Sequence, residues 1–486
     1  MGRVLNFINR GLTLLLHGLI LWIFLTASWW WRPRWIYADW VPSQFNAGLL
    51  QPFNSAPYLA DYYARYALTM FIVLLIILWA LNFFRGAMRI LDDGRIWWVM
   101  ALTLLTFWAW FSTSWVGDYP AGMTSDYVSQ MVAVSSSQAT QWLLTLAFAV
   151  VVICAGPPQR WILVALVGGM LVQASLGIIQ SAFQHTAGLA WLDDSLLKVG
   201  LGLREYTYDP AQSGSPVIQS GGIRYLRAYG LTPHPNLLAG GLVMGLAATL
   251  GLWWRESTRR IAGLITVVGL WALLLTFSRA GLGGYAVAIG SAVALGFWAL
   301  PRPQWREMLT LGLLVVLVSG LFYLMFRPLV DVRAGQGEEG TASVEELSVQ
   351  ARAVYLDHAR QMIEDNPIKG VGIGAFPWVS HHYLQSQSFD LQGDNVHRVY
   401  YLAAAELGII GWGLVLATFV SGAWLVWQRR QQRQLTPEAI ALLAGVIGWL
   451  AIGWFEFFPW SLFTHQVLFW GVFAAALKPE DIHATN

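Results

Sequence analysis

The sequence contains little cysteine and little charge, and both shortages restrict what the protein can do. Cys154 is the only cysteine, so neither a disulfide nor a cysteine-based metal site can form within one chain. Charged residues make up 12% of the chain and the formal net charge is +2, which gives no basis for nucleic-acid binding. An internal repeat, which many transporters contain, is not evident either.

Long apolar runs make up most of the sequence between the few charged residues. Apolar residues make up 56% of the chain and aromatic residues 14%, and the charge-free runs recur along the whole length. This pattern predicts an all-α polytopic membrane protein, with residues 1–486 as one integral membrane domain. About twelve runs are long enough to span a bilayer: 11–31, 66–84, 96–116, 142–158, 161–184, 235–254, 261–278, 280–300, 308–326, 399–428, 439–455 and 460–477.

Basic residues between these runs predict the orientation. They recur in alternate connections, at Arg3, Arg10, Arg85, Arg89, Arg95, Arg160, Arg255, Arg259, Arg260, Arg302, Arg306, Arg429, Arg430, Arg433 and Lys478. The positive-inside tendency then places both termini in the cytoplasm, with run 11–31 as a retained helix. Two long connections, 185–234 and 327–398, fall on the outer side.

The second outer connection has a helix signal of its own. Ser343 and Glu346 form a capping-box pattern, apolar residues follow at helical spacing, and Pro367 ends the run. We predict an amphipathic surface helix over about 344–365.

Arg279 is the most informative single residue. It is the only charged residue between Arg260 and Arg302, in a stretch whose helical length of roughly 60 Å is enough for two crossings. The chain is therefore expected to turn at Arg279, at the outer face. A cation between two membrane helices either binds an anion or anchors the turn to headgroups.

Two further segments place polar residues at the outer ends of membrane runs. Arg224, Arg227 and His234 precede the run that begins near Asn236, and His397 and Arg398 precede the run 399–428. Arginine offers a planar fork of donors suited to phosphate, and histidine can take a proton from a hydroxyl near neutral pH. Gathered at one membrane face, these side chains indicate phosphate-dependent transfer chemistry on a lipid carrier.

Four segments resemble motifs of the O-antigen ligase and polymerase superfamily. RAYGLTPHPNLLAG is similar to its R-A-x-G-T-x-x-x-P-N-x-L-A-G segment, and TFSRAG to its T-x-S-R-x-G segment. NPIKGVGIGAF resembles its N-P-x-x-G-x-G-x-G-x-F turn, and VHRVYYLAAAELGIIG its H-N-x-Y-L-x-x-x-x-E-x-G-x-x-G helix. The four segments occur in the family's order over about 227–411. Arg398 stands where the family commonly has asparagine.

The resemblance implies an inverting, metal-independent glycosyltransferase of the GT-C type in the bacterial inner membrane, active at the periplasmic face in lipopolysaccharide biosynthesis. It would move an undecaprenyl-diphosphate-linked glycan onto a sugar hydroxyl of lipid A–core. Arg227 and Arg279 would hold the diphosphate, and His397 would be the general base. Arg224, His234, Arg352, Arg398 and Tyr401 are weaker candidates for substrate contact.

Alternatives remain open at this point. The enzyme could be an O-antigen or exopolysaccharide polymerase, whose acceptor is another lipid-linked glycan, or a bacterial protein O-glycosyltransferase. The alternative hypothesis from a different functional class is a lipid-linked sugar flippase or transporter. Asp193 and Asp194 lack a further acidic ligand, so we predict no metal and no cofactor.

Overall fold

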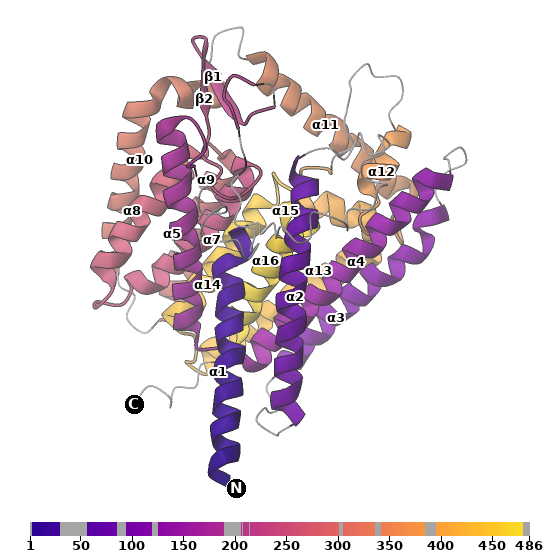
Figure 1. Ribbon diagram of the computed structural model, residues 1–486, viewed down its shortest axis with the longest axis vertical. Coiled ribbons are helices and arrows are strands. Elements are labelled where there is room, and N and C mark those ends of the chain that lie inside the picture. The colour runs from indigo at the N-terminus through magenta and orange to yellow at the C-terminus, as the bar shows by residue number, and fades with distance from the viewer. Residues whose placement is uncertain are drawn as a thin grey trace.

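A computed structural model describes residues 2–29, 56–84, 94–118, 125–188, 206, 208–212, 214–300, 305–335, 342–383 and 395–479. The described residues form a helical assembly with one small hairpin (Figure 1). The helices are α1 (Gly2–Thr26), α2 (Ala56–Phe84), α3 (Arg95–Phe111), α4 (Ser125–Ala155), α5 (Gln159–Phe183), α7 (Pro235–Trp253), α8 (Arg259–Leu275), α9 (Arg279–Ala299), α10 (Trp305–Arg333), α11 (Ala342–Asp365), α12 (Phe376–Ser380), α13 (Val399–Gln431), α14 (Pro437–Ile452), α15 (Phe458–Ser461) and α16 (Phe463–Leu477). Strands β1 (Val217–Ser220) and β2 (Ile223–Leu226) pair antiparallel.

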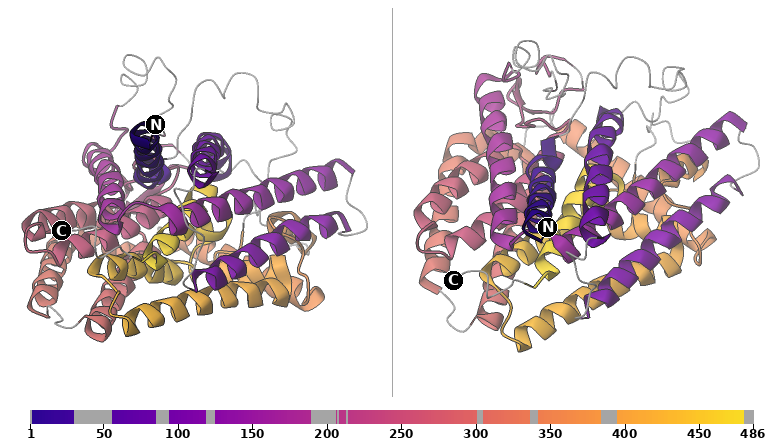
Figure 2. Two further views of the ribbon diagram at one scale, coloured as in Figure 1. Left: turned by 90° about the horizontal axis from the view of Figure 1, so that it is seen from below. Right: turned by 60° about the horizontal axis from the view of Figure 1, so that its bottom comes forward.

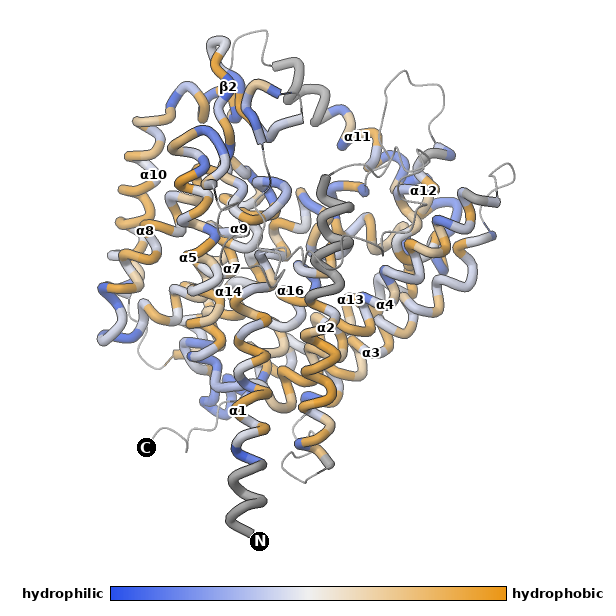
Figure 3. The backbone as a smooth tube through the Cα atoms, viewed as in Figure 1, coloured by the Kyte–Doolittle hydropathy of each residue, from blue (hydrophilic) through white to orange (hydrophobic). Residues whose placement is uncertain are grey.

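The helices are those of a multi-pass membrane protein. Among the described residues, eight helices are long and apolar enough to cross a membrane, and three shorter apolar helices accompany them. Figure 3 shows hydrophobic residues along the middle of the bundle and hydrophilic residues toward its two ends. The expected all-α polytopic class is therefore confirmed, while the count of twelve crossings stays a prediction.

Two C-terminal helices form the interior of the bundle. Every residue of α16 is buried, and α14 packs against α7, α9 and α16. The outer helices surround this centre, with α4 on α16, α5 and α8 on α7, and α3 on α13 (Figures 1 and 2). The ends of helices that are distant in sequence therefore lie together at the same end of the bundle.

One end of the bundle is basic. Arg255, after α7, donates to Glu438 at the start of α14 through Nε (2.7 Å), and Arg259 on α8 pairs with Glu307 on α10 at 3.5 Å. The opposite end holds the beginnings of α7, α9 and α13 together with the hairpin and α11 (Figure 1). We call this opposite end the site end.

Two helices depart from regular geometry near the site end. In α10 the backbone is non-helical at Phe326, two residues before Pro328, and the helix then continues to Arg333. Proline cannot donate its backbone hydrogen bond, so a bend here is expected. The predicted outer connection 327–398 thus opens with a further helical segment, and α11 spans Ala342–Asp365, where the sequence predicts a surface helix.

The second irregular helix is α13, which is interrupted at Gly408 (φ 63°). The turn after α11 fills the interruption: Ile409 N–H donates to the carbonyl of Pro367 at 2.8 Å. A Cβ at Gly408 would lie 2.2 Å from the carbonyl oxygen of Ile368, so the close approach requires glycine. The glycine-rich run after α11 is therefore a tight turn that docks on α13.

Candidate functional site

The first element of the site is the start of α7. Pro235 occupies the first turn, where its missing N–H costs nothing. His234 is the N-cap residue, and its Nδ1 accepts a hydrogen bond from Asn236 N–H at 3.2 Å. The arrangement fixes the side chain of Asn236 at the helix entrance.

Glutamines of α5 hold the irregular segment that precedes α7. Gln184, just after α5, accepts from Leu226 N–H at 2.7 Å, and Gln180 exchanges two hydrogen bonds with the backbone of Gly230, at 2.7 and 2.8 Å. Gln173 accepts from the next residue's N–H at 2.8 Å. Irregular backbone inside a membrane protein must be satisfied internally, and these side-chain amides satisfy it. The position of Arg227, within this segment, follows from them.

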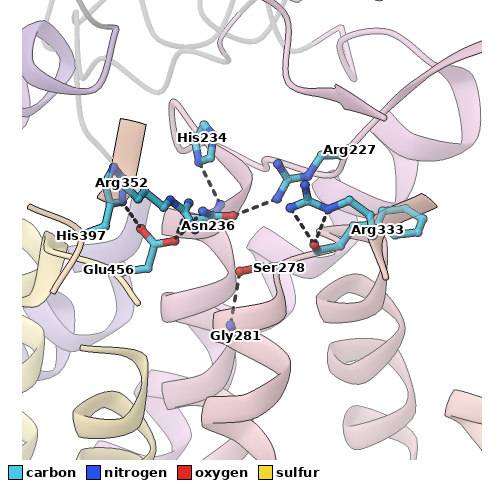
Figure 4. A network of polar contacts seen from close by, with 10 residues as sticks. Arg227, His234, Asn236, Ser278, Gly281, Arg333, Arg352, His397 and Glu456 are labelled. Carbon is cyan, nitrogen blue, oxygen red and sulfur yellow. Dashed lines mark hydrogen bonds and ion pairs between the residues drawn. The ribbon is translucent and has the colours of Figure 1, made fainter. Parts of the chain in front are cut away.

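Arg227 is buried and bonded on two sides. Its Nε donates to the carbonyl of Thr276 at 2.7 Å, and its Nη2 donates to Oδ1 of Asn236 at 2.8 Å. The guanidinium thus joins the turn between α8 and α9 to the start of α7 (Figure 4).

The turn between α8 and α9 also accepts hydrogen bonds from a second cation, Arg333 at the end of α10. Phe277 adopts φ 48°, a conformation that costs a bulky residue free energy. Its ring packs against Tyr225 and Phe322, and its carbonyl accepts from Nε and Nη2 of Arg333 at 3.4 Å. These contacts hold the strained turn and bring Arg333 beside Arg227 (Figure 4).

Arg279 follows this turn as the first residue of α9. Ser278 caps the helix by accepting from Gly281 N–H at 3.2 Å. Arg279 is exposed, and its Nη1 donates to the backbone carbonyl of Arg333 at 3.2 Å. The chain does turn at Arg279, as the sequence predicts.

A histidine and a carboxylate form the other end of the site. Oε2 of Glu456 lies 3.4 Å from Nδ1 of His397, and the His397 ring packs edge-on against Phe457 at 5.1 Å. The pair meets because Val399 N–H, at the start of α13, donates to the carbonyl of Gly453 at 2.8 Å. This backbone bond joins the start of α13 to the turn after α14.

Asn236 connects the two ends. Its Nδ2 donates to Oε1 of Glu456 at 2.6 Å, while its Oδ1 accepts from Arg227. Arg352 on α11 approaches the same carboxylate, with its Nη2 3.8 Å from Oε1. A continuous polar line therefore runs from His397 through Glu456 and Asn236 to Arg227 (Figure 4).

The electrostatics of this line favour an ionised Glu456 and a neutral His234. Burial alone raises the pKa of Glu456, but the hydrogen bond and charge of His397, together with the charge of Arg352, outweigh burial and lower it. The pKa of His234 falls to about 3, mainly through burial and then through the neighbouring charge of Arg227. A neutral His234 can accept the Asn236 N–H bond described above.

The remaining candidates lie apart from this line. Arg224 is on β2 and donates to the carbonyl of Gln212 at 2.9 Å. Arg398 is the N-cap residue of α13 and makes no side-chain cap bond. Among the described residues, neither Arg398 nor Tyr401 is hydrogen-bonded or ion-paired to a member of the line. The neighbouring Tyr400 donates to the carbonyl of Leu450 at 2.7 Å.

Sequence reasoning missed three residues of the site: Glu456, Arg333 and Asn236 in its role as a bridge between Arg227 and Glu456. Glu456 had the same signal as Arg279, because it is the only Asp, Glu, Lys or Arg between Glu438 and Lys478. Arg333 gave no comparable signal, since its importance depends on how far α10 continues.

Metal ligands do not cluster in the part of the chain that the structure describes, where no group of three or more His, Cys, Asp and Glu could hold an ion. Asp193 and Asp194 lie outside the described residues. The expectation of a metal-free site stays a prediction.

The polar line includes two of the predicted site residues, Arg227 and His397, while Arg279 donates to the backbone carbonyl of Arg333. Part of the site falls in a known family segment. Residues 264–416 match the O-antigen ligase family. The predicted resemblance is thereby confirmed. The matched segment contains Arg279, Arg333, Arg352 and His397.

The O-antigen ligase match indicates an enzyme of the ligase or polymerase type, which acts on a lipid-linked glycan and a glycan acceptor. Arg227, Asn236 and Glu456 lie outside the matched residues. Their participation rests on their contacts and, for Arg227 and Asn236, on the resemblance of RAYGLTPHPNLLAG to a family motif. A comparison with curated proteins found no match.

Proposed function

We propose that the protein is an inverting, metal-independent glycosyltransferase that transfers a glycan from undecaprenyl diphosphate to a sugar hydroxyl of lipid A–core. The observation that carries the proposal is the separation of roles along one polar line. Cations lie at one end, around Arg227, and a histidine–carboxylate pair lies at the other, at His397 and Glu456. A transfer from a diphosphate needs both.

The cationic end suits the donor diphosphate. The guanidinium groups of Arg227 and Arg333 both contact the turn between α8 and α9, and Arg279 begins α9. The starts of α7 and α9 meet here, and helix N-termini favour anions through their backbone N–H groups and dipoles. Guanidinium groups keep their charge and offer paired donors to phosphate oxygens. They would stabilise the negative charge that develops as the diphosphate leaves.

The other end suits the acceptor hydroxyl. Nδ1 of His397 is directed at Glu456, so Nε2 is the ring nitrogen that would take the proton. The ionised carboxylate holds the ring in that tautomer and stabilises the imidazolium that forms, as in other histidine–carboxylate pairs. Arg352 and Asn236 hold Glu456 in turn.

The reaction is a single displacement. The acceptor oxygen forms a bond to the anomeric carbon and loses its proton to Nε2 of His397. The bond between that carbon and the diphosphate oxygen breaks, and its electron pair leaves with the diphosphate. Attack from the side opposite the leaving group inverts the anomeric configuration.

The orientation follows the charge pattern. The end of the bundle with Arg255 and Arg259 would face the cytoplasm, which would place the site end in the periplasm of a bacterial inner membrane. Twelve crossings, with both termini cytoplasmic and a GT-C type of architecture, belong to the same proposal.

A reconstituted assay tests the function. Purified protein in liposomes receives lipid-linked glycan with and without lipid A–core, and the products are separated by size. Glycan on lipid A–core is the expected product. Longer carrier-linked chains in the absence of core would instead establish a polymerase, and glycopeptides in mass spectrometry would establish a protein acceptor.

The same liposomes separate an enzyme from a flippase. A transferase forms product when donor and acceptor are both on the side of the site end, without moving the donor across the bilayer. Movement of labelled donor between leaflets without any transfer would contradict the proposal.

A further inference from the structure

A cavity lies between α13 and α14 beside the polar line. Its volume is about 350 Å³, within the range of roughly 300–1,000 Å³ that is typical of ligand pockets. Val399, Tyr400 and Ala403 line it from the start of α13, and Trp449 and Gly453 from the end of α14 and the following turn.

The cavity is apolar, and three polar side-chain atoms of its lining are hydrogen-bonded to other groups. The hydroxyl of Tyr400 donates to the carbonyl of Leu450, and the indole N–H of Trp449 donates to the carbonyl of Gly240 at 2.8 Å. The indole N–H of Trp460 donates to Glu406 at 2.8 Å. What faces the cavity is aromatic ring and aliphatic surface, which suits a hydrocarbon chain.

The packing of the bundle explains why the space exists. Helix α13 packs against α3, whereas α14 packs against α7 and α9, and Phe469 and Trp470 of the buried α16 line the cavity between them. Two lining residues, Leu416 and Trp454, are about half exposed on the outer surface of the bundle. A chain could therefore enter sideways from the membrane.

Two residues that line the cavity lie close in the chain to the base and its carboxylate partner, and no lining residue lies close in the chain to the cations. Val399 is two residues from His397, and Gly453 is three residues from Glu456. Arg227 and Arg333 lie beyond Asn236, at the opposite end of the site from His397 (Figure 4). An amphiphile with its chain in the cavity would therefore have its polar head at His397, where the acceptor hydroxyl must lie.

We propose that this cavity binds an acyl chain of the acceptor glycolipid and so positions the acceptor's sugar at His397. The proposal rests on the proposed function and adds to it the site of the acceptor's lipid anchor. The donor's prenyl chain would leave from the cationic end, along α8, α9 and α10.

A cavity-filling variant tests the assignment. Ala403→Phe places a ring into the cavity, and Val420→Phe is the matched control, because Val420 lies on the same helix, is 59% exposed and does not line the cavity. Transfer is measured with lipid A–core, with a water-soluble core oligosaccharide that lacks acyl chains, and over a range of donor concentrations.

We expect Ala403→Phe to raise KM for lipid A–core by about tenfold, which corresponds to the loss of a modest apolar contact. KM for the soluble oligosaccharide and KM for the donor should stay at the wild-type value, and Val420→Phe should change none of the three. A raised donor KM would show that the cavity holds the prenyl chain, and three unchanged constants would show that only bulk lipid fills it. Either result overturns the proposal.

Photo-crosslinking of the wild-type protein gives a second measurement that does not depend on the variant's folding. A lipid A–core analogue with a diazirine on an acyl chain should label peptides of α13 and α14, and a diazirine-bearing prenyl diphosphate should not. The opposite labelling pattern, or labelling spread evenly over the exposed helices, overturns the acceptor assignment. Absence of transfer by the wild-type protein with every acceptor would instead refute the proposed function.

Discussion

Nδ1 of His397 lies 3.4 Å from Oε2 of Glu456, although His397 precedes α13 and Glu456 lies between α14 and α15. The contact orients the half-buried ring of His397 against the buried carboxylate of Glu456. It also gives the candidate base a partner that lies outside the matched family segment.

The first prediction concerns this pair. His397→Ala should lower kcat by about 10²-fold or more and leave donor KM nearly unchanged, because a base acts in the transition state and contributes little to donor binding. Glu456→Gln should also lower kcat, since an amide can donate to Nδ1 and so favour the wrong tautomer. Steady-state kinetics in liposomes measure both. Glu307→Gln, at the basic end, is the control, and a normal rate for His397→Ala would remove the base assignment.

The second prediction concerns Arg279. Arg279→Ala should abolish glycan transfer while lipid-linked donor accumulates at the outer face, because the cation is needed to hold and neutralise the leaving diphosphate. Arg306→Ala, at the other end of the bundle, should transfer normally. Retained transfer by the Arg279 variant would count against the placement of the diphosphate.

The third prediction concerns the fork of Arg227. Arg227→Lys keeps the charge, but an ammonium group cannot reproduce the geometry that reaches both the Thr276 carbonyl and the Asn236 amide. Donor KM should rise by about tenfold, a change of roughly 1.4 kcal/mol. Arg224→Lys is the matched control, since the Arg224 guanidinium donates to the carbonyl of Gln212 and contacts no member of the polar line among the described residues. Equal KM values for the two variants would show that the fork is unimportant.

The fourth prediction concerns the glutamines behind Arg227. Gln180→Leu removes the partner of both the N–H and the carbonyl of Gly230, and each buried unsatisfied group costs about 1–3 kcal/mol. The unfolding midpoint in detergent should fall, and Gln219→Leu on the exposed face of β1 should leave it unchanged. An unaltered midpoint for Gln180→Leu would mean that water or another side chain replaces the amide.

The fifth prediction is a pH dependence of stability. His234 has a pKa of about 3 in the folded chain against an ordinary value of 6.5. Between these values the unfolded chain binds a proton that the folded chain does not, so stability should fall as pH falls through this window. Glu456, whose pKa is lowered, should add to the loss only below its ordinary value.

His234→Asn isolates this effect, because asparagine retains a side-chain oxygen for the helix cap but does not titrate. Its unfolding midpoint should change less than that of the wild-type protein between about pH 6.5 and pH 5. Parallel curves for the two proteins would assign the acid sensitivity to another group.

Several features of the site could be read from the sequence because each produced a local contrast. Arg279 is a lone charge in a long apolar run, and the Pro–Asn pair at the start of α7 marks a helix start. Glu456 shows the same contrast in the apolar stretch between Glu438 and Lys478, but the sequence analysis did not select it. The surface helix over about 344–365 was expected from its capping pattern, and α11 occupies that segment.

The sequence by itself determined a multi-pass helical membrane protein, because apolar runs of sufficient length have few alternatives in a bilayer. It also determined which residue types could hold a phosphate or move a proton. Only the tertiary structure decided their pairing. Asn236 bridges Arg227 and Glu456 because α7 and α14 pack together, and His397 meets Glu456 because α13 is bonded to Gly453. Such contacts depend on the distances between helices, which hydrophobic periodicity does not encode.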